Sequence, residues 1–330
     1  MPANLPPQYT KAEEDYRRAT SPADRLEALR ELFRLLPKHK GTEKLQSDLK
    51  TKISRARDEI ETSKSGGKKG GVSYRVPREG AGQVVLVGAA NVGKSAILAG
   101  LTNARPEIAP YPFTTRTPQP GMVEHLDIRY QLVDLPPVTA EFFEPWMPGV
   151  IRSADAALFV VDLGDDDLID AAEVVLSRLA AAHIELVGEL PFDSEDEMTR
   201  HVRTTIIANK VDVDGARDRL AILREWYGER FPIIGASASG GGDLDSVRSE
   251  GYDMLGVIRV YTKVPGRPAD RSHPFTVPIG STVLELAREV HRDFEQSLKF
   301  AKVWGSGAFE GQTVRRDHEL RDVDVVELHA

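Results

Sequence analysis

Cysteine is absent from the 330-residue chain, which excludes disulfides and thiolate metal sites and suits a reducing compartment. No run approaches the roughly 18 apolar residues that a membrane-spanning helix needs. The first twenty residues also lack the apolar core of a signal peptide. We therefore expect a cytoplasmic protein that does not engage a membrane.

Basic residues are fewer than acidic ones: the chain has 43 Lys and Arg residues and 51 Asp and Glu residues, for a formal net charge of -8. This balance disfavours a protein that coats nucleic acid over its whole surface. Residues 38–72 depart from it, with ten basic residues against five acidic ones. This basic arm either contacts RNA phosphates or is an ordinary solvated helix face, and the sequence leaves both interpretations open.

Composition divides the chain into segments 1–72, 73–256 and 257–330, enough for more than one domain. The first segment predicts a helical hairpin over residues 21–62, followed by a glycine-rich basic linker. Ser21 and Pro22 begin its first helix. The apolar residues of that helix recur on one face, namely Leu26, Leu29, Leu32, Phe33 and Leu36.

The middle segment alternates short β-rich runs with helical stretches, which predicts an α/β fold with a largely parallel sheet. The candidate strands are residues 83–87, 121–126, 129–133, 157–161, 204–208 and 232–236. The last segment predicts a strand at 258–263, a helix from Val283 to Glu295 and a terminal strand at 324–328. Thr282 and Glu285 form a candidate capping box for that helix.

A phosphate-binding loop follows the first of these strands and leads into a helix-forming stretch. The pattern G-x-x-x-x-G-K-S needs this context, because backbone N–H groups and a helix N-terminus must face the phosphates. We predict that Lys94 reaches the β- and γ-phosphates and that the Ser95 hydroxyl binds Mg²⁺. The predicted nucleotide-binding residues here are Gly88, Ala89, Ala90, Asn91, Val92, Gly93, Lys94, Ser95 and Ala96.

Two further residues are predicted to complete the part of the nucleotide site that binds the phosphates and Mg²⁺. Asp134 ends an apolar strand about forty residues after Lys94 and suits a carboxylate that holds Mg²⁺. Thr114 or Thr115, in a hydroxyl-rich loop between them, would supply a second hydroxyl to the metal, and we favour Thr115. Lys94, Thr115 and Asp134 are therefore the candidate catalytic residues.

The part of the site that binds the nucleotide base is predicted from Asn209, Lys210 and Asp212, which follow a second apolar strand. Open α/β sheets bind ligands at such carboxyl ends. Asp212 accepts two hydrogen bonds from guanine, whereas adenine lacks that donor pair. Asn209 would bond the loop and the base, and the Lys210 stem would cover the ring. Ser237 and Ala238 are predicted to offer a backbone N–H to the guanine oxygen.

Taken together, these motifs resemble the Obg superfamily, and specifically its branch of developmentally regulated GTP-binding (DRG) proteins. The Phe113-Thr114-Thr115 segment and residues 258–263, 300–305 and 317–328 are similar to that branch and its C-terminal TGS domain. Residues 39–61 look like its N-terminal helical region. The resemblance implies a GTPase domain over 73–256, a β-grasp TGS domain over 257–330, and association with ribosomes or RNA. A DRG-type regulatory protein is a further expected partner.

Three residues bear on the activity. The family's Asp-x-x-Gly motif reads Asp134-Leu-Pro-Pro137 here, and Pro137 has no N–H to donate to the γ-phosphate. Val138 stands where many regulatory GTPases place a water-orienting Gln. Asn91 resembles the residue that binds K⁺ in potassium-activated relatives, although a solvent-facing amide is as good an interpretation.

We therefore expect a GTPase that is slow and stimulated by a partner or by K⁺. The alternative is a GTP-binding module that does not hydrolyse GTP, which Pro137 and Val138 favour. An ATPase of the neighbouring Obg branch is disfavoured by the guanine-reading Asp212. Trp304 and Phe300 either stack on bases or belong to a small core, and the core is the commoner use of such residues.

Overall fold

The computed structural model describes residues 28–29, 32–33, 35, 76–102, 117–191, 198–238, 244–305 and 308–329. The chain forms two compact units, Met1–Val72 and Ser73–Ala330. In the first unit the five described residues are helical, and Leu29 and Leu32 are buried. The rest of the predicted hairpin and the whole basic arm lie outside the described residues.

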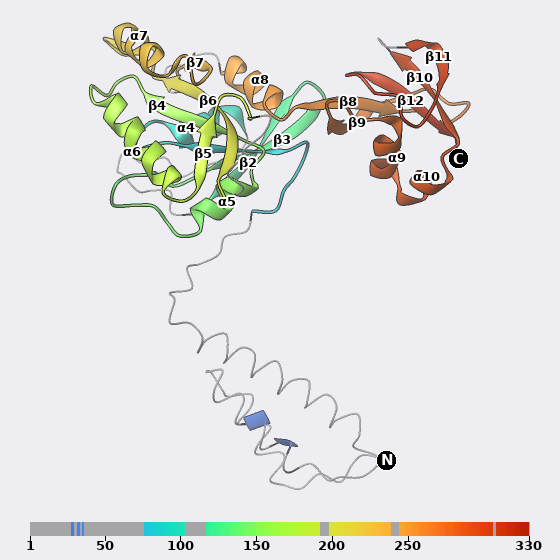
Figure 1. The fold of residues 1–330 in the computed structure, drawn as a ribbon, viewed down its shortest axis with the longest axis horizontal. Coiled ribbons are helices and arrows are strands. Elements are labelled where there is room, and N and C mark those ends of the chain that lie inside the picture. The colour runs from blue at the N-terminus through green and yellow to red at the C-terminus, as the bar shows by residue number, and fades with distance from the viewer. Residues whose placement is uncertain are drawn as a thin grey trace. The chain divides into compact units, whose positions relative to one another are not determined.

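The second unit contains a seven-stranded sheet with the order β2-β3-β1-β4-β6-β5, in which β7 also pairs with β6 (Figure 1). All its strand pairs are parallel except β2 with β3, so the predicted parallel-rich α/β sheet is confirmed. The sequence prediction missed only β5 among these strands. The bounds are β1 Gln83–Val87, β2 Gln119–His125, β3 Ile128–Asp134, β4 Ala156–Asp162, β5 Ile184–Val187, β6 Arg200–Asn209 and β7 Ile233–Ala236.

Helices cover both faces of this sheet, and strand β1 shows why. Val85 and Val87 point into one core and Val84 and Leu86 into the other, so the apolar run is buried on both sides. The first core takes residues from α5, α6 and α7, and the second from α4 and α8. The bounds are α4 Lys94–Leu101, α5 Met147–Ser153, α6 Leu168–Ala180, α7 Ala216–Tyr227 and α8 Asp245–Asp253.

A five-stranded sheet with the order β11-β10-β12-β8-β9 forms the C-terminal part. Its elements are β8 Val257–Thr262, β9 Asp270–Pro278, α9 Val283–Val290, α10 Arg292–Ser297, β10 Phe300–Gly305, β11 Ala308–Val314 and β12 Asp324–His329. The strands predicted at 258–263 and 324–328 correspond to β8 and β12. The core of this part lies between the sheet and α9, and includes Val260, Leu286, Val303 and Val326.

The single helix predicted from Val283 to Glu295 is wrong, because the structure has two helices. His291 is extended, with φ −169° and ψ 140°, and separates α9 from α10. The buried residues of α9 are Val283, Leu286 and Ala287. The first helix therefore ends at the extended backbone of His291, whose N–H still donates to the Ala287 carbonyl. The predicted capping box is present, with Thr282 and Glu285 bonding each other's backbone N–H.

Trp304 and Phe300 are half-buried on the face of β10 that points away from this core. Lys263 Nζ lies 4.1 Å from the centre of the Trp304 ring, and the Phe300 ring stacks on His329 at 4.4 Å. Their assignment to a small core is therefore wrong in this fold. None of the helices in the described part of the chain has the length and hydropathy of a membrane span.

Candidate functional site

The loop between β1 and α4 has a backbone that only glycine can provide at two points. Gly93 has φ 95°, and a Cβ there would lie 2.1 Å from Asn209 Nδ2. A Cβ on Gly88 would lie 2.5 Å from the carbonyl oxygen of Val160. Asn91 is exposed and also left-handed, with φ 60°. The two glycines of the motif are therefore explained by close packing and by backbone conformation.

Lys94 begins α4 and is buried, although its side chain ends in an ammonium group. Its Nζ donates to the carbonyl oxygens of Gly88 at 3.1 Å and Ala89 at 2.7 Å. Burial lowers the Lys94 pKa to about 8, and the nearby Asp134 carboxylate opposes this shift. The loop thus holds a cation at the helix N-terminus, which is an arrangement that binds anions.

Ser95 and Asp134 meet beside this lysine. The Ser95 hydroxyl donates to Asp134 Oδ2 at 2.5 Å, and Asp134 is fully buried at the end of β3. Adjacent hydroxyl and carboxylate oxygens fit Mg²⁺, which prefers oxygen donors and usually keeps water and substrate phosphates as its other ligands. Thr114 and Thr115 lie in residues 103–116, outside the described part of the chain.

Asn209 joins three loops at the other end of the site. It ends β6, and its Nδ2 donates to the Val92 carbonyl of the phosphate loop at 2.8 Å. Its Oδ1 accepts the N–H of Ala238 at 3.2 Å. The N–H of Ala238, predicted to face guanine, thus bonds Asn209 in this structure. One buried amide therefore fixes the spacing between the phosphate loop and the loops that are predicted to bind the base.

Asp212 is exposed, whereas its neighbour Ser237 is buried. The Ser237 hydroxyl bonds the Asp212 carboxylate and is the largest influence that holds the Asp212 pKa below its ordinary value. The carboxylate is therefore ionised and oriented at neutral pH, as an acceptor for guanine must be. Lys210, two residues before Asp212, has a left-handed backbone, with φ 65°.

Comparisons with known proteins agree with this geometry. A family profile described as 50S ribosome-binding GTPase matches residues 83–190, and one described as TGS domain matches residues 258–330. An uncharacterized GTP-binding protein of Methanocaldococcus jannaschii is 26% identical over 364 residues, covering 92% of each chain. Developmentally-regulated G-protein 2 of Arabidopsis thaliana is 26% identical over 353 residues, covering 88% of this chain and 87% of that protein.

The chain carries a GTPase domain and a TGS domain, and its homologues are DRG-like GTP-binding proteins. Its P-loop GTPase domain and C-terminal TGS domain are thereby confirmed, and membership of a GTPase family supports a GTP-hydrolysing enzyme. The solved structure of the YchF GTPase of Schizosaccharomyces pombe shares the fold. It has a TM-score of 0.54 and 13% sequence identity, and the match covers 78% of this chain and 100% of that chain.

The segment after Asp134 is packed into the core. Leu135, Pro136, Pro137 and Val138 are all buried. The N–H of Val138 donates to the Gly88 carbonyl of the phosphate loop at 3.1 Å. The side chain of Val138 is buried in the core that contains α5 and α6.

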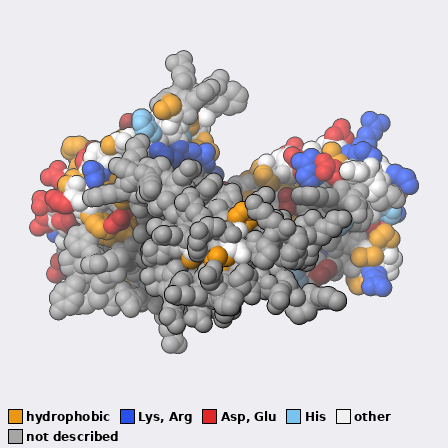
Figure 2. All heavy atoms as spheres, turned by 90° about the horizontal axis from the view of Figure 1, so that it is seen from below, with side chains coloured by type: hydrophobic (Ala, Val, Ile, Leu, Met, Phe, Trp, Pro, Cys, Tyr) orange, Lys and Arg blue, Asp and Glu red, His pale blue; other side chains and the backbone are white. Residues whose placement is uncertain are grey.

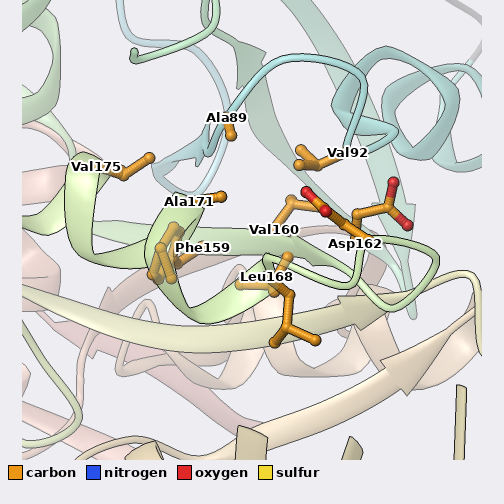
Figure 3. Close-up of a pocket in the computed structure, with 11 residues that line it drawn as sticks. Ala89, Val92, Phe159, Val160, Asp162, Leu168, Ala171 and Val175 are labelled. Atoms are coloured by element: carbon orange, nitrogen blue, oxygen red, sulfur yellow. The ribbon is translucent and has the colours of Figure 1, made fainter. Parts of the chain in front are cut away.

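A small apolar pocket lies behind the phosphate loop (Figure 3). Its lining includes Ala89 and Val92 from the loop, Phe159 from β4 and Leu168 from α6. Asp162 lies at the end of the pocket where Val92 lies, and Val175 lies at the opposite end (Figure 3).

The loop from β4 to α6 is acidic at residues 165–167. Acidic side chains, drawn red, also gather at the left edge of the view in Figure 2. Sequence reasoning missed Asp162, although one signal was available. Asp162 ends the apolar strand β4 just as Asp134 ends β3.

Proposed function

We propose that this chain is a nucleotide switch that binds GTP and GDP, hydrolyses GTP slowly and acts in the cytoplasm on ribosomes or RNA. The bonds of Asn209 carry the proposal, because they hold the phosphate loop and the Ser237-Ala238 loop at one sheet edge. Guanine is then read by Asp212, and the phosphates are met by Lys94 and the loop N–H groups. The ribosomal partner is supported by the description of the matching family as 50S ribosome-binding.

The proposal includes two metal ions, Mg²⁺ and K⁺, each bound by oxygen ligands. Ser95 and Asp134 would hold Mg²⁺, with Thr115 as a further ligand, and the ion would neutralise charge on the β- and γ-phosphates. Asn91, which is exposed on the phosphate loop, is the proposed ligand of K⁺. Stimulation by a partner or by K⁺ would then raise a low intrinsic rate.

Multiple-turnover phosphate release tests this function directly. Rates should be higher in K⁺ than in Na⁺ buffer and should rise again when ribosomes are added. Asn91→Ala should lose the K⁺ stimulation while it keeps the rate measured in Na⁺. If the wild-type chain releases no phosphate under any of these conditions, the switch proposal is wrong and the second candidate below gains support.

The second candidate is a GTP-binding module that does not hydrolyse GTP. Pro137 offers no donor, and the N–H of Val138 already donates to the Gly88 carbonyl, so neither residue is available to the γ-phosphate in this arrangement. Such a module would serve as a scaffold for a partner. Tight GTP binding without phosphate release, with or without ribosomes, would favour it.

Residues 38–72 are the proposed RNA-contacting arm, and a DRG-type regulatory protein is a further proposed partner. Phosphate contacts release counterions, so binding through the arm should weaken as salt rises. Removing residues 1–72 should lower both the affinity for ribosomal RNA and its salt dependence. Identical binding by the truncated chain would assign the arm a role within the protein instead.

A further inference from the structure

The ammonium group of Lys210 is held by a residue outside the recognised GTPase motifs. Lys210 Nζ lies 2.5 Å from Asp162 Oδ2. The two side chains are 29% and 14% exposed, so water screens this pair less than it screens a surface ion pair. The lysine side chain is therefore directed to one partner.

Asp162 is itself fixed by the backbone around it. It is the last residue of β4 and pairs in register with Asn209, the last residue of β6. Its Oδ1 accepts the N–H of Gly164 at 2.7 Å, which leaves Oδ2 for Lys210. The N–H of Leu163 donates to the Asn209 carbonyl at 2.9 Å. The carboxylate thus has one orientation, set by two adjacent strands.

Lys210 is constrained at both ends. Its backbone is in the left-handed region, which a lysine seldom adopts, and its amino group is anchored on the neighbouring strand. The aliphatic stem must therefore run from the end of β6 to the end of β4. Ligands of open α/β sheets bind beyond these carboxyl ends. A stem held across them offers an apolar wall at low entropic cost, because its rotamers are already fixed.

We propose that Asp162 is a positioning residue for guanine, which it serves by fixing the Lys210 stem against the base. This inference rests on the proposed function, because it presumes that guanine binds beside Lys210. The nearby pair of Arg219 and Asp166 provides a contrast. Asp166 is 87% exposed and its partner Arg219 bonds the backbone of both adjoining loops, so that pair braces loops without directing a base-facing side chain.

The test compares the affinity of labelled GDP for Asp162→Asn with that for the wild type. The amide keeps the size and the Gly164 bond but loses the charge. We expect GDP and GTP to bind about tenfold more weakly and to the same extent, as for loss of one charge-assisted hydrogen bond. The inhibition constant of pyrophosphate, which probes only the phosphate end, should not change. Asp166→Asn is the matched control and should bind GDP as the wild type does.

A double-mutant cycle separates positioning from a merely structural role. In a Lys210→Met background, Asp162→Asn should cause no further loss of affinity, because the ammonium group through which Asp162 holds the stem is gone. A tenfold loss in that background, or no loss in the wild-type background, would overturn the proposal. If Asp162→Asn does not fold, Lys210→Arg and Lys210→Gln provide the test. Arg should retain most of the affinity and Gln should not, and equal affinities would overturn the proposal.

These outcomes are distinct from failure of the proposed function. A wild-type chain that binds no guanine nucleotide would refute that function. A wild-type chain that binds GDP, together with an unchanged Asp162→Asn variant, would refute only the role of Asp162.

Discussion

At Lys94 two physical effects oppose each other, and burial dominates. Burial lowers the pKa to about 8, which is below the ordinary lysine value, while Asp134 favours the charged form. The free-energy cost of burying charged Lys94 is therefore fully present below about pH 8 and declines as the pH rises from there to 10.5. Nucleotide phosphates favour the charged form, so binding above pH 8 must take up a proton.

We therefore expect GDP affinity to fall as pH rises from about 8, by at most about tenfold per pH unit. Calorimetry at pH 9 in buffers of different ionisation enthalpy should report net proton uptake. Guanine itself loses a proton in alkaline solution, so Lys94→Arg is the control. Because arginine stays charged, any pH dependence of GDP affinity in this variant comes from the nucleotide. Equal pH slopes in both proteins would show that Lys94 is not the titrating group.

Pro137 is the second residue with a testable consequence. If its missing N–H limits hydrolysis, Pro137→Gly should raise the single-turnover rate, since glycine restores a donor and torsional freedom. The gain should appear mainly in kcat, because the remaining loop already binds the ground state. Pro137→Ala restores the donor with less freedom and separates the two effects. Equal rates in all three proteins would mean that the proline does not affect hydrolysis.

The sequence motifs correctly indicated which residues lie together where a local pattern determines their position. Lys94, Ser95 and Asp134 lie where their motifs place them, and Asn209 contacts the phosphate loop. Asp162 was missed because its contact with Lys210 depends on β4 lying next to β6 in one register. Likewise the packing of Val138 depends on a core that also takes residues from β1, α5 and α6. No local pattern encodes either neighbour.

Elements were predictable to the extent that their own residues specify their ends. Helix α9 begins where its capping box indicates, whereas the predicted helix ran through His291, whose extended backbone ends α9 in the structure. Strand β5 has only four residues, Ile184–Val187, and its pairing with β6 requires the whole sheet. Short elements that depend on neighbours are therefore the ones that sequence patterns miss.

The cap of α9 makes a prediction about stability. The Thr282 hydroxyl accepts the N–H of Glu285, and Glu285 accepts the N–H of Thr282. Thr282→Ala should lower the free energy of unfolding of the C-terminal part by about 1 kcal/mol, the usual effect of losing an N-cap. Urea unfolding followed by circular dichroism measures this change. Thr282→Ser keeps the hydroxyl oxygen and should retain most of the stability.

For the larger unit, the ion-pair network of Asp127, Arg259 and Asp322 links the two sheets. Asp127 lies in the turn between β2 and β3, and Asp322 lies just before β12. Arg259 on β8 donates to Asp127 Oδ1 at 2.8 Å and to Asp322 Oδ2 at 2.7 Å. The Tyr261 hydroxyl donates to Asp127 Oδ2. Strand β3 continues from this turn to Asp134, so the network reaches the strand that carries the candidate metal ligand.

Removal of the Asp127 carboxylate should loosen this link while both sheets stay folded. Burial alone would raise the Asp127 pKa, but hydrogen bonds from Tyr261 and Arg259 outweigh it and hold the pKa below its ordinary value. The pKa of Asp322 is also held low, because its bonds to Arg259 outweigh burial. A lowered folded pKa means that the stabilisation is present above about pH 4 and is lost as pH falls through the folded value.

Asp127→Asn should therefore increase proteolytic cleavage near Gly256, which joins α8 to β8, by about tenfold at pH 7 for loss of one charge-assisted bond. Lowering the pH below the folded pKa of Asp127, which is held under its ordinary value, should remove most of the difference, because the wild-type carboxylate is then protonated as well. An acid-stable protease such as pepsin can be used for the measurements at low pH. Glu124→Gln, an exposed acid on the same hairpin, is the matched control. Cleavage rates that are equal at pH 7, or a difference that persists below the folded pKa of Asp127, would show that its charge does not hold the two sheets together.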